Sequence, residues 1–292
     1  MNSIEYVASI LKQEGVEWMA CYPSNPLIEA VAKEGIRPVA FRHERGAVMA
    51  ADGFSRLSDR KRFGVVAMQS QAGAENSVGG LSQAYADNVP ILVLPGGNSL
   101  DMLFIRPNFF AARTWESVVK KVEFISRPDQ TGNVMRRAFH ALRSGSTGPV
   151  VVEMPIDVCM ADIPERARPY TSPMPALSGP SPHDLEDAAK ALVAAKNPLI
   201  WAGAGVLSAG ATEELRALAE LLDIPVYTSM PGKSAFDERH PLSLGAGGST
   251  VTGPARQWLD DADVIFAIGA SLTSSPYAQR FSPEKFLIHS VI

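Results

Sequence analysis

The sequence is poor in several features that mark particular classes of protein. It has two cysteines, Cys21 and Cys159, far apart and without a C-x-x-C pair, and its five histidines show no metal-ligand spacing. Neither a disulfide framework nor a metal site is therefore predicted. No apolar run approaches the roughly 20 residues that span a bilayer, and the amino terminus lacks the basic and apolar regions of a signal peptide. We expect a cytoplasmic protein with no membrane partner.

An excess of one charge is also missing. The formal net charge is −4, and Lys, Arg, Asp and Glu are scattered along the chain. Because no basic stripe is present, nucleic acid is not an expected partner. Apolar residues make up 46% of the 292 residues, which is enough to bury substantial cores. This length suits two domains of about 150 residues each, in the composition range of a soluble enzyme.

The clearest compositional break is the segment 163–182. Its sequence, IPERARPYTSPMPALSGPSP, contains six prolines. Proline removes a backbone donor and clashes inside a helix, so the segment favours an extended surface connection. We therefore predict a first domain at 1–162, a linker at 163–182 and a second domain at 183–292.

Strand and helix patterns alternate in both halves of the chain. Apolar runs that predict strands occur at 19–22, 39–42, 63–68, 91–94, 150–153, 199–202, 226–229 and 264–268. Helical patterns lie between most of them. Such alternation predicts an α/β protein with two doubly wound parallel-sheet domains. The turn at 203–205 lacks the spacing of a dinucleotide fingerprint, and we interpret it as a tight structural turn.

Glu44 stands where an apolar strand gives way to a helix rich in small residues. Residues 38–41 predict the strand, and apolar side chains then recur at helical spacing at Ala47, Val48, Ala50, Ala51 and Phe54. A carboxylate is stabilised at a helix start, and the carboxyl end of a strand faces the ligand crevice of α/β sheets. The alternative is a first-turn glutamate that serves only the helix dipole.

The run around Glu44, HERGAVMAADGFSR, resembles the segment with the catalytic glutamate in the pyrimidine-binding domain of thiamine diphosphate enzymes of the acetolactate synthase and 2-oxo acid decarboxylase superfamily. Further segments resemble this family in family order. They are SIEYVASILKQEGVEWMACYPSNP, QAGAENSVGGLSQAYADNVPILVLPGG and TGPVVVEMPIDV for the first domain, then NPLIWAGAGVLSAGA, DIPVYTSMPGKSAFDERHPLSLGAGG, DADVIFAIGASL and FLIHSVI for the central domain. Several ordered segments are more specific than one short motif. The resemblance implies a pyrimidine-binding domain at 1–162 and a central domain at 183–292.

The resemblance also implies roles for individual residues. Glu44 matches the catalytic glutamate, which hydrogen-bonds the aminopyrimidine and drives removal of the thiazolium C2 proton. The implied cofactor-binding residues are Tyr22, Pro23, Ser24, Asn25, Glu44, Gly73 and Asn76, and the implied substrate contacts are Gln71 and Lys120. Ser24 and Asn25 stand where the family often has two glycines, and an asparagine turn cap is an alternative for Asn25. A solvated lysine is the alternative for Lys120.

Two family motifs are missing. Residues 269–275 lack the arginine and paired aspartates of flavin-containing synthases, so the resemblance argues against bound FAD. No Gly-Asp-Gly motif occurs, so we expect the Mg²⁺ and diphosphate ligands outside this chain. A subunit of a split enzyme and a fragment of a longer polypeptide both stay open. Either would need a chain or domain with the diphosphate-binding motif, in a homo- or hetero-oligomer.

The implied function is therefore that of a thiamine diphosphate-dependent lyase or transferase. Its expected substrate is a small 2-oxo acid, decarboxylated and joined to a second carbonyl compound as in acetolactate synthase. A 2-oxo acid decarboxylase or a 2-hydroxyacyl-CoA lyase is the alternative within this class. A non-catalytic homologue used for assembly is the alternative from another class. Glu44 argues against it, because a structural role would not require a carboxylate there.

Overall fold

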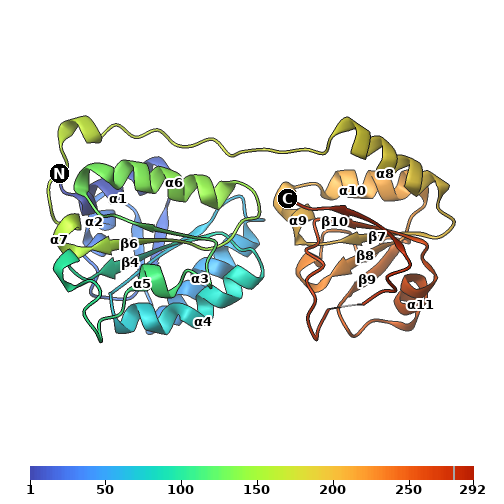
Figure 1. The fold of residues 1–292 in the computed structure, drawn as a ribbon, viewed down its shortest axis with the longest axis horizontal. Helices are drawn as coiled ribbons and strands as arrows, with labels where there is room; N and C mark the ends of the chain where they lie inside the picture. Colours follow the sequence, from blue (N-terminus) through green and yellow to red (C-terminus); the bar gives the residue numbers. More distant parts are fainter. Residues whose placement is uncertain (279) are drawn as a thin grey trace. The chain divides into compact units, whose positions relative to one another are not determined.

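A computed structural model describes residues 1–278 and 280–292 of the chain. The chain divides into two compact units, Met1–Leu177 and Ser178–Ile292. Each unit is built on one parallel sheet with helices on its faces (Figure 1). The prediction of two doubly wound parallel sheets is therefore confirmed. The division between the units falls inside the proline-rich segment 163–182.

The first unit contains a six-stranded sheet in the order β2-β1-β3-β4-β6-β5. Its strands are β1 (Trp18–Cys21), β2 (Arg37–Ala40), β3 (Gly64–Met68), β4 (Ile91–Gly97), β5 (Lys121–Phe124) and β6 (Val150–Pro155). Its helices are α1 (Ser3–Gln13), α2 (Leu27–Lys33), α3 (Glu44–Leu57), α4 (Ala72–Ala86), α5 (Ala111–Thr114), α6 (Thr131–Arg143) and α7 (Ile156–Cys159). Short 3₁₀ turns lie at η1 (Leu100–Met102), η2 (Pro128–Gln130) and η3 (Glu165–Ala167).

Apolar cores fill both faces of this sheet. Helices α1, α2 and α6 cover one face, and α3, α4 and α5 cover the other (Figure 1). All five residues of β3 are buried, as expected for a continuous apolar run in a parallel sheet covered on both sides. Among the described residues, no helix is both long and apolar enough to cross a membrane.

The strand order creates a switch point between β1 and β3. The chain leaves β1 toward β2 on one side, whereas β3 is followed by β4 on the other side. Loops that diverge in this way leave a crevice outside the carboxyl ends of the strands, where α/β sheets bind ligands. We call this edge of the first sheet the carboxyl edge. The loops after β1 and β3 therefore border the expected ligand position.

The second unit contains a five-stranded parallel sheet in the order β11-β10-β7-β8-β9. Its strands are β7 (Pro198–Ala202), β8 (Val226–Ser229), β9 (Ser243–Gly247), β10 (Val264–Ile268) and β11 (Phe286–Ser290). Its helices are α8 (Pro182–Ala194), α9 (Ala204–Ala209), α10 (Thr212–Leu222) and α11 (Gly253–Asp261), with the 3₁₀ turn η4 (Met230–Gly232).

The glycines at 203–205 are explained by packing. The segment expected as a tight turn begins the short helix α9. A Cβ on Gly203 would lie 2.2 Å from the carbonyl oxygen of Gly269, and a Cβ on Gly205 would lie 2.6 Å from its Cα. Real Cβ atoms do not approach so closely, so the start of α9 packs backbone to backbone against the end of β10.

Candidate active site

Glu44 is the first residue of α3 and is buried, with 3% of its surface exposed. The preceding His43 caps the helix, because its Nδ1 accepts the backbone N–H of Arg45 at 3.1 Å. Asn76 Nδ2 donates to Glu44 Oε2 at 3.2 Å, and His43 Nδ1 lies 3.9 Å from the same oxygen. A glutamate that served only the helix dipole would need no burial. The site therefore begins with a buried carboxylate fixed through one of its two oxygens.

The other oxygen of Glu44 faces Gly73 in the first turn of α4. A Cβ on Gly73 would lie 3.2 Å from Glu44 Oε1 and 2.5 Å from Gln69 Cγ. Within the described part of the chain, Oε1 accepts no hydrogen bond. Because Gly73 has no side chain, no Cβ from α4 crowds this oxygen.

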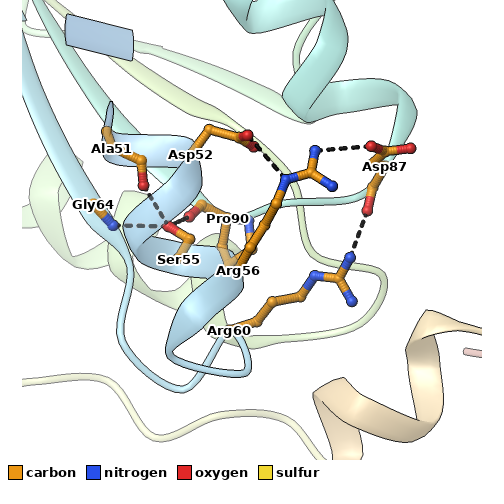
Figure 2. A network of polar contacts seen from close by, with 8 residues as sticks. All are labelled: Ala51, Asp52, Ser55, Arg56, Arg60, Gly64, Asp87 and Pro90. Carbon is orange, nitrogen blue, oxygen red and sulfur yellow. Dashed lines mark hydrogen bonds and ion pairs between the residues drawn. The ribbon is translucent and has the colours of Figure 1, made fainter. Parts of the chain in front are cut away.

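Helices α3 and α4, which carry these residues, are clamped together at their far ends (Figure 2). Arg56 Nε donates to Asp52 Oδ2 at 2.9 Å, and Arg56 Nη2 donates to Asp87 Oδ2 at 2.8 Å. Arg60 Nη2 adds a bond to the backbone oxygen of Asp87 at 2.9 Å. Asp52 is buried, so its negative charge needs this arginine. These contacts, which we call the clamp, fix the position of α3 along the axis of α4.

A second set of bonds fixes α3 on the sheet. The Ser55 hydroxyl lies 2.6 Å from the carbonyl oxygen of Pro90 and accepts the N–H of Gly64 at 2.8 Å (Figure 2). A Cβ on Gly64 would lie 2.3 Å from the carbonyl oxygen of Ala51, so β3 begins in backbone contact with α3. These bonds and the clamp leave the helix that carries Glu44 little freedom to slide.

The loop 22–25 after β1 lies at the carboxyl edge. Of its four residues only Asn25 is buried, and Ser24 has a left-handed backbone with φ of 77°. Asn25 Nδ2 donates to the carbonyl oxygens of Met68 at 2.8 Å and Leu94 at 3.1 Å, while its Oδ1 accepts the N–H of Leu27 at 3.0 Å. Asn25 thus ties the loop to the ends of β3 and β4, in the manner of the turn-cap alternative.

Gln71, at the N-cap of α4, organises the loop that follows β4. Its Nε2 donates to Asn98 Oδ1 at 3.0 Å and to Asn108 Oδ1 at 3.3 Å, and its Oε1 accepts the N–H of Phe109 at 2.9 Å. Both ends of the side-chain amide are therefore used within the chain. Its role in this structure is to hold the loop 98–109 at the carboxyl edge.

Comparisons of the sequence with known proteins identify the family of this chain. The family model described as "Thiamine pyrophosphate enzyme, N-terminal TPP binding domain" matches residues 1–105, and "Thiamine pyrophosphate enzyme, central domain" matches residues 185–292. The chain belongs to the thiamine pyrophosphate enzyme family. Glu44, Gly73 and Asn76 all lie within the matched N-terminal domain.

Several curated relatives of this thiamine pyrophosphate enzyme chain are acetolactate synthases. It is 33% identical to a probable acetolactate synthase large subunit of Methanocaldococcus jannaschii, over 99% of this chain and 51% of the relative. It is 31% identical to the acetolactate synthase isozyme 3 large subunit of Escherichia coli, over 99% of this chain and 52% of the relative. The acetolactate synthase of Mycobacterium bovis is 33% identical over 88% of this chain and 42% of its own length. The chain thus spans about half the length of these relatives.

The structure does not bring Lys120 close to Glu44 at the carboxyl edge of the first sheet. Its ammonium group donates to the carbonyl oxygens of Ala141 at 2.6 Å and Ser144 at 2.5 Å, at the end of α6. Lys120 precedes β5 and so lies at the opposite edge of the sheet from Glu44. Partial burial lowers the pKa of Lys120, and the neighbouring Lys121 lowers it further. The half-buried side chain caps a helix instead of being solvated.

Glu153 is a buried acid that the sequence patterns did not single out. It lies near the end of β6, 2% exposed, and accepts the N–H of Ala112 at 2.6 Å. Burial raises its pKa to about 7, although the backbone N–H groups of Ala112 and Ala111 lower it. A charged residue inside the apolar run VVVEMP was the available signal. Glu153 anchors the far end of the loop that Gln71 holds.

The described residues contain no cluster of three or more His, Cys, Asp or Glu side chains arranged to hold a metal ion. Beside the Glu44 carboxylate the structure places the Asn76 amide, the His43 imidazole and Gly73. A buried carboxylate beside an open glycine suits the aminopyrimidine end of thiamine diphosphate, which presents ring nitrogens and an amino group.

Proposed function

We propose that this chain supplies the pyrimidine-binding and central domains, residues 1–162 and 183–292, of a thiamine diphosphate-dependent enzyme. Its reaction would be decarboxylation of a 2-oxo acid with carboligation, as the names of the acetolactate synthase relatives suggest. The observation that carries the proposal is Glu44, a buried carboxylate held by Asn76 with its second oxygen open beside Gly73.

Each residue of this group has a distinct task in the proposal. Asn76 fixes the orientation of the Glu44 carboxylate, and Gly73 leaves room for a flat ring beside it. Glu44 Oε1 would exchange a proton with a pyrimidine ring nitrogen as a general acid and base. Thiamine diphosphate, when bound, supplies an acidic thiazolium carbon and an electron sink for decarboxylation. Tyr22, Pro23 and Ser24 would border the ring from the loop after β1.

The proposal includes a partner. Mg²⁺ is usually held by one or two carboxylates together with substrate phosphates. We therefore place the Mg²⁺ and diphosphate ligands on another chain or domain, in a homo- or hetero-oligomer, and we propose that no FAD binds at 269–275. The proposed substrate is a small 2-oxo acid.

The test of the proposal is the exchange of the C2 proton of thiamine diphosphate for deuterium, followed by NMR. The chain is assembled with a domain or subunit that carries a Gly-Asp-Gly motif. Glu44→Gln keeps the shape of the side chain but cannot exchange the proton, so exchange should slow by roughly 100-fold or more.

Glu75→Gln is the matched control, because Glu75 is an exposed acid in the first turn of α4. This variant should exchange like the unmodified protein. Equal exchange rates in the Glu44→Gln variant and the unmodified assembly would refute the catalytic assignment.

A further inference from the structure

The turn between β3 and α4 holds Gln71 in a backbone conformation that favours glycine. Its φ is 57° and its ψ is −121°. These angles match the first central position of a type II′ turn, about +60° and −120°, where glycine is strongly preferred. Other residues persist in such conformations only where the surrounding structure holds them, and they are concentrated at functional sites. The strain at Gln71 therefore requires contacts that hold this residue in place.

Three hydrogen bonds of the Gln71 side chain supply these contacts. A strained turn between a strand and a helix raises the side chain at its apex above the edge of a sheet. From this apex the Gln71 amide bonds to Asn98, to Asn108 and to the backbone of Phe109, at 2.9 to 3.3 Å. We call these three hydrogen bonds the latch. The strained backbone aims the side chain at the loop 98–109, and the latch holds the backbone in its strained form.

The latch is the polar link between the loop 98–109 and the start of α4. Within the described residues, every hydrogen bond that joins these two segments involves Gln71. The loop also has supports away from α4. The N–H of Leu100 donates to Asp157 Oδ2 at 3.0 Å, and Glu153 holds the segment just beyond the loop. Loss of the latch would therefore separate the loop from α4 without unfolding the rest of the domain.

The backbone of Gln71 connects the latch to the proposed site. Its carbonyl oxygen accepts the N–H of Glu75 at 3.0 Å and so begins α4. The next residue, Asn76, donates to Glu44 Oε2 at 3.2 Å. In the same first turn, a Cβ on Gly73 would lie 3.2 Å from Glu44 Oε1. A change in ψ of Gln71 would rotate this turn and move both neighbours of the Glu44 carboxylate.

We propose that Gln71 is a positioning residue that couples the loop 98–109 to the Glu44 carboxylate. When the loop is docked, the latch holds the strained turn, and the turn places Asn76 within reach of Glu44. When the loop is displaced, the turn relaxes and the hydrogen bond from Asn76 is lost. Coupling of this kind needs an element with two arrangements that both sites bias, and the strained turn is that element. This inference rests on the proposed function and adds a regulation of the same site.

Two substitutions separate the backbone of Gln71 from its side chain. Gln71→Ala removes the latch but keeps a Cβ, so the strained turn should relax. Gln71→Gly removes the latch as well, yet glycine adopts this turn without strain. Both variants should release the loop, and only Gln71→Ala should also release Asn76.

Amide hydrogen exchange of the full chain, followed by NMR, measures release of the loop. The N–H of Phe109, which donates to Gln71 Oε1, should exchange roughly tenfold faster or more in both variants. The N–H of Thr114, which donates to the carbonyl oxygen of Phe110 beyond the loop, should keep its rate and serves as the internal reference. An unchanged rate at Phe109 in either variant would overturn the latch.

The side-chain amide of Asn76 measures the effect on Glu44. Its ¹⁵N–¹H signals are recorded on the full chain labelled at asparagine and are assigned with Asn76→Asp. In Gln71→Ala these signals should move toward those of a solvated amide. In Gln71→Gly they should stay in place, because the turn that begins α4 is kept. Equal Asn76 signals in the two variants would overturn the role of the strained turn.

A variant on the loop tests the coupling even if Gln71→Ala does not fold. Asn98→Ala combined with Asn108→Ala removes two latch bonds without a change in α4. This pair should shift the Asn76 signals in the unmodified chain but not in the Gln71→Gly chain, and a shift in both or in neither would overturn the coupling. Ser99→Ala, in the same loop but outside the latch, is the matched control and should shift nothing. These measurements involve no thiamine diphosphate, so their failure is distinguishable from a failed C2 exchange test of the proposed function.

Discussion

The pH dependence of stability tests the burial of Glu153. Its pKa is about 7 in the folded chain, against an ordinary value of 4.5. Because the pKa of Glu153 is raised on folding, the folded chain holds this proton more tightly than the unfolded chain does. The stabilisation that protonated Glu153 gives to the folded chain is therefore complete below about pH 4.5 and is lost as the pH rises through 7. At 1.36 kcal/mol per pH unit, the difference between the two values corresponds to about 3 kcal/mol.

Glu153→Gln removes this titration while one oxygen remains to accept the N–H of Ala112. The free energy of unfolding of the variant, relative to that of the unmodified chain, should therefore rise by about 2 to 3 kcal/mol between pH 5 and pH 8. Urea denaturation followed by the fluorescence of the buried Trp115, three residues after Ala112, measures this difference.

Glu123→Gln is the control, because Glu123 is a buried acid on the neighbouring strand β5. Burial alone would raise the pKa of Glu123, but hydrogen bonds from Arg137 and Lys121 bring it below its ordinary value. Its contribution is lost only as the pH falls through that lower pKa, so its variant should show no trend between pH 5 and pH 8. A flat difference for Glu153→Gln over the same range would refute the reasoning about Glu153.

Three further predictions concern the clamp, the flavin and the partner. The variant Arg56→Met removes the ion pairs with Asp52 and Asp87 but keeps an apolar stem. It should lower the free energy of unfolding of the first unit, measured by urea denaturation, by about 2 kcal/mol. An unchanged free energy of unfolding would show that these ion pairs do not stabilise the contact between α3 and α4. The purified chain should show no visible flavin absorbance, and stoichiometric FAD released on denaturation would disprove the interpretation of 269–275. In calorimetric titrations the chain alone should bind thiamine diphosphate and Mg²⁺ weakly, and it should consume no pyruvate. Addition of a domain with Gly-Asp-Gly should restore both tight cofactor binding and pyruvate consumption. Tight Mg²⁺-dependent binding together with pyruvate turnover by the chain alone would contradict the need for a partner.

The fold was predictable where strands are continuous apolar runs. The expected strand at 63–68 corresponds to β3, Gly64–Met68, whose side chains are all buried. Strand β5 was not predicted, because its sequence KVEF carries two charged residues. The structure shows that Glu123 of this strand is neutralised by Arg137 of α6, at 2.6 Å. Such a pairing depends on tertiary packing, which the periodicity of one strand does not contain.

The site was predictable only in part, for a similar reason. Glu44 stood out through its motif and its place at a strand-to-helix junction. Gln71 was expected to contact cofactor or substrate, but its partners lie 27 to 38 residues further along the chain. Asn25 likewise bonds to carbonyl groups 43 and 69 residues away. Local patterns indicate that a residue is polar and lies in a loop, whereas its partners are set by the strand order.

The small residues of α3 and α4 illustrate how local pattern and site geometry are connected. A Cβ on Gly80 would lie 2.8 Å from Cγ1 of Val48, so the separation of the two helices depends on a missing side chain. Asn76 lies one turn before Gly80 and reaches Glu44 across the same contact, at 3.2 Å. A larger residue at position 80 would push the helices apart and lengthen that hydrogen bond, because packed helices adjust their spacing to the side chains between them. The glycine and alanine pattern therefore sets the distance at which the Glu44 carboxylate is held.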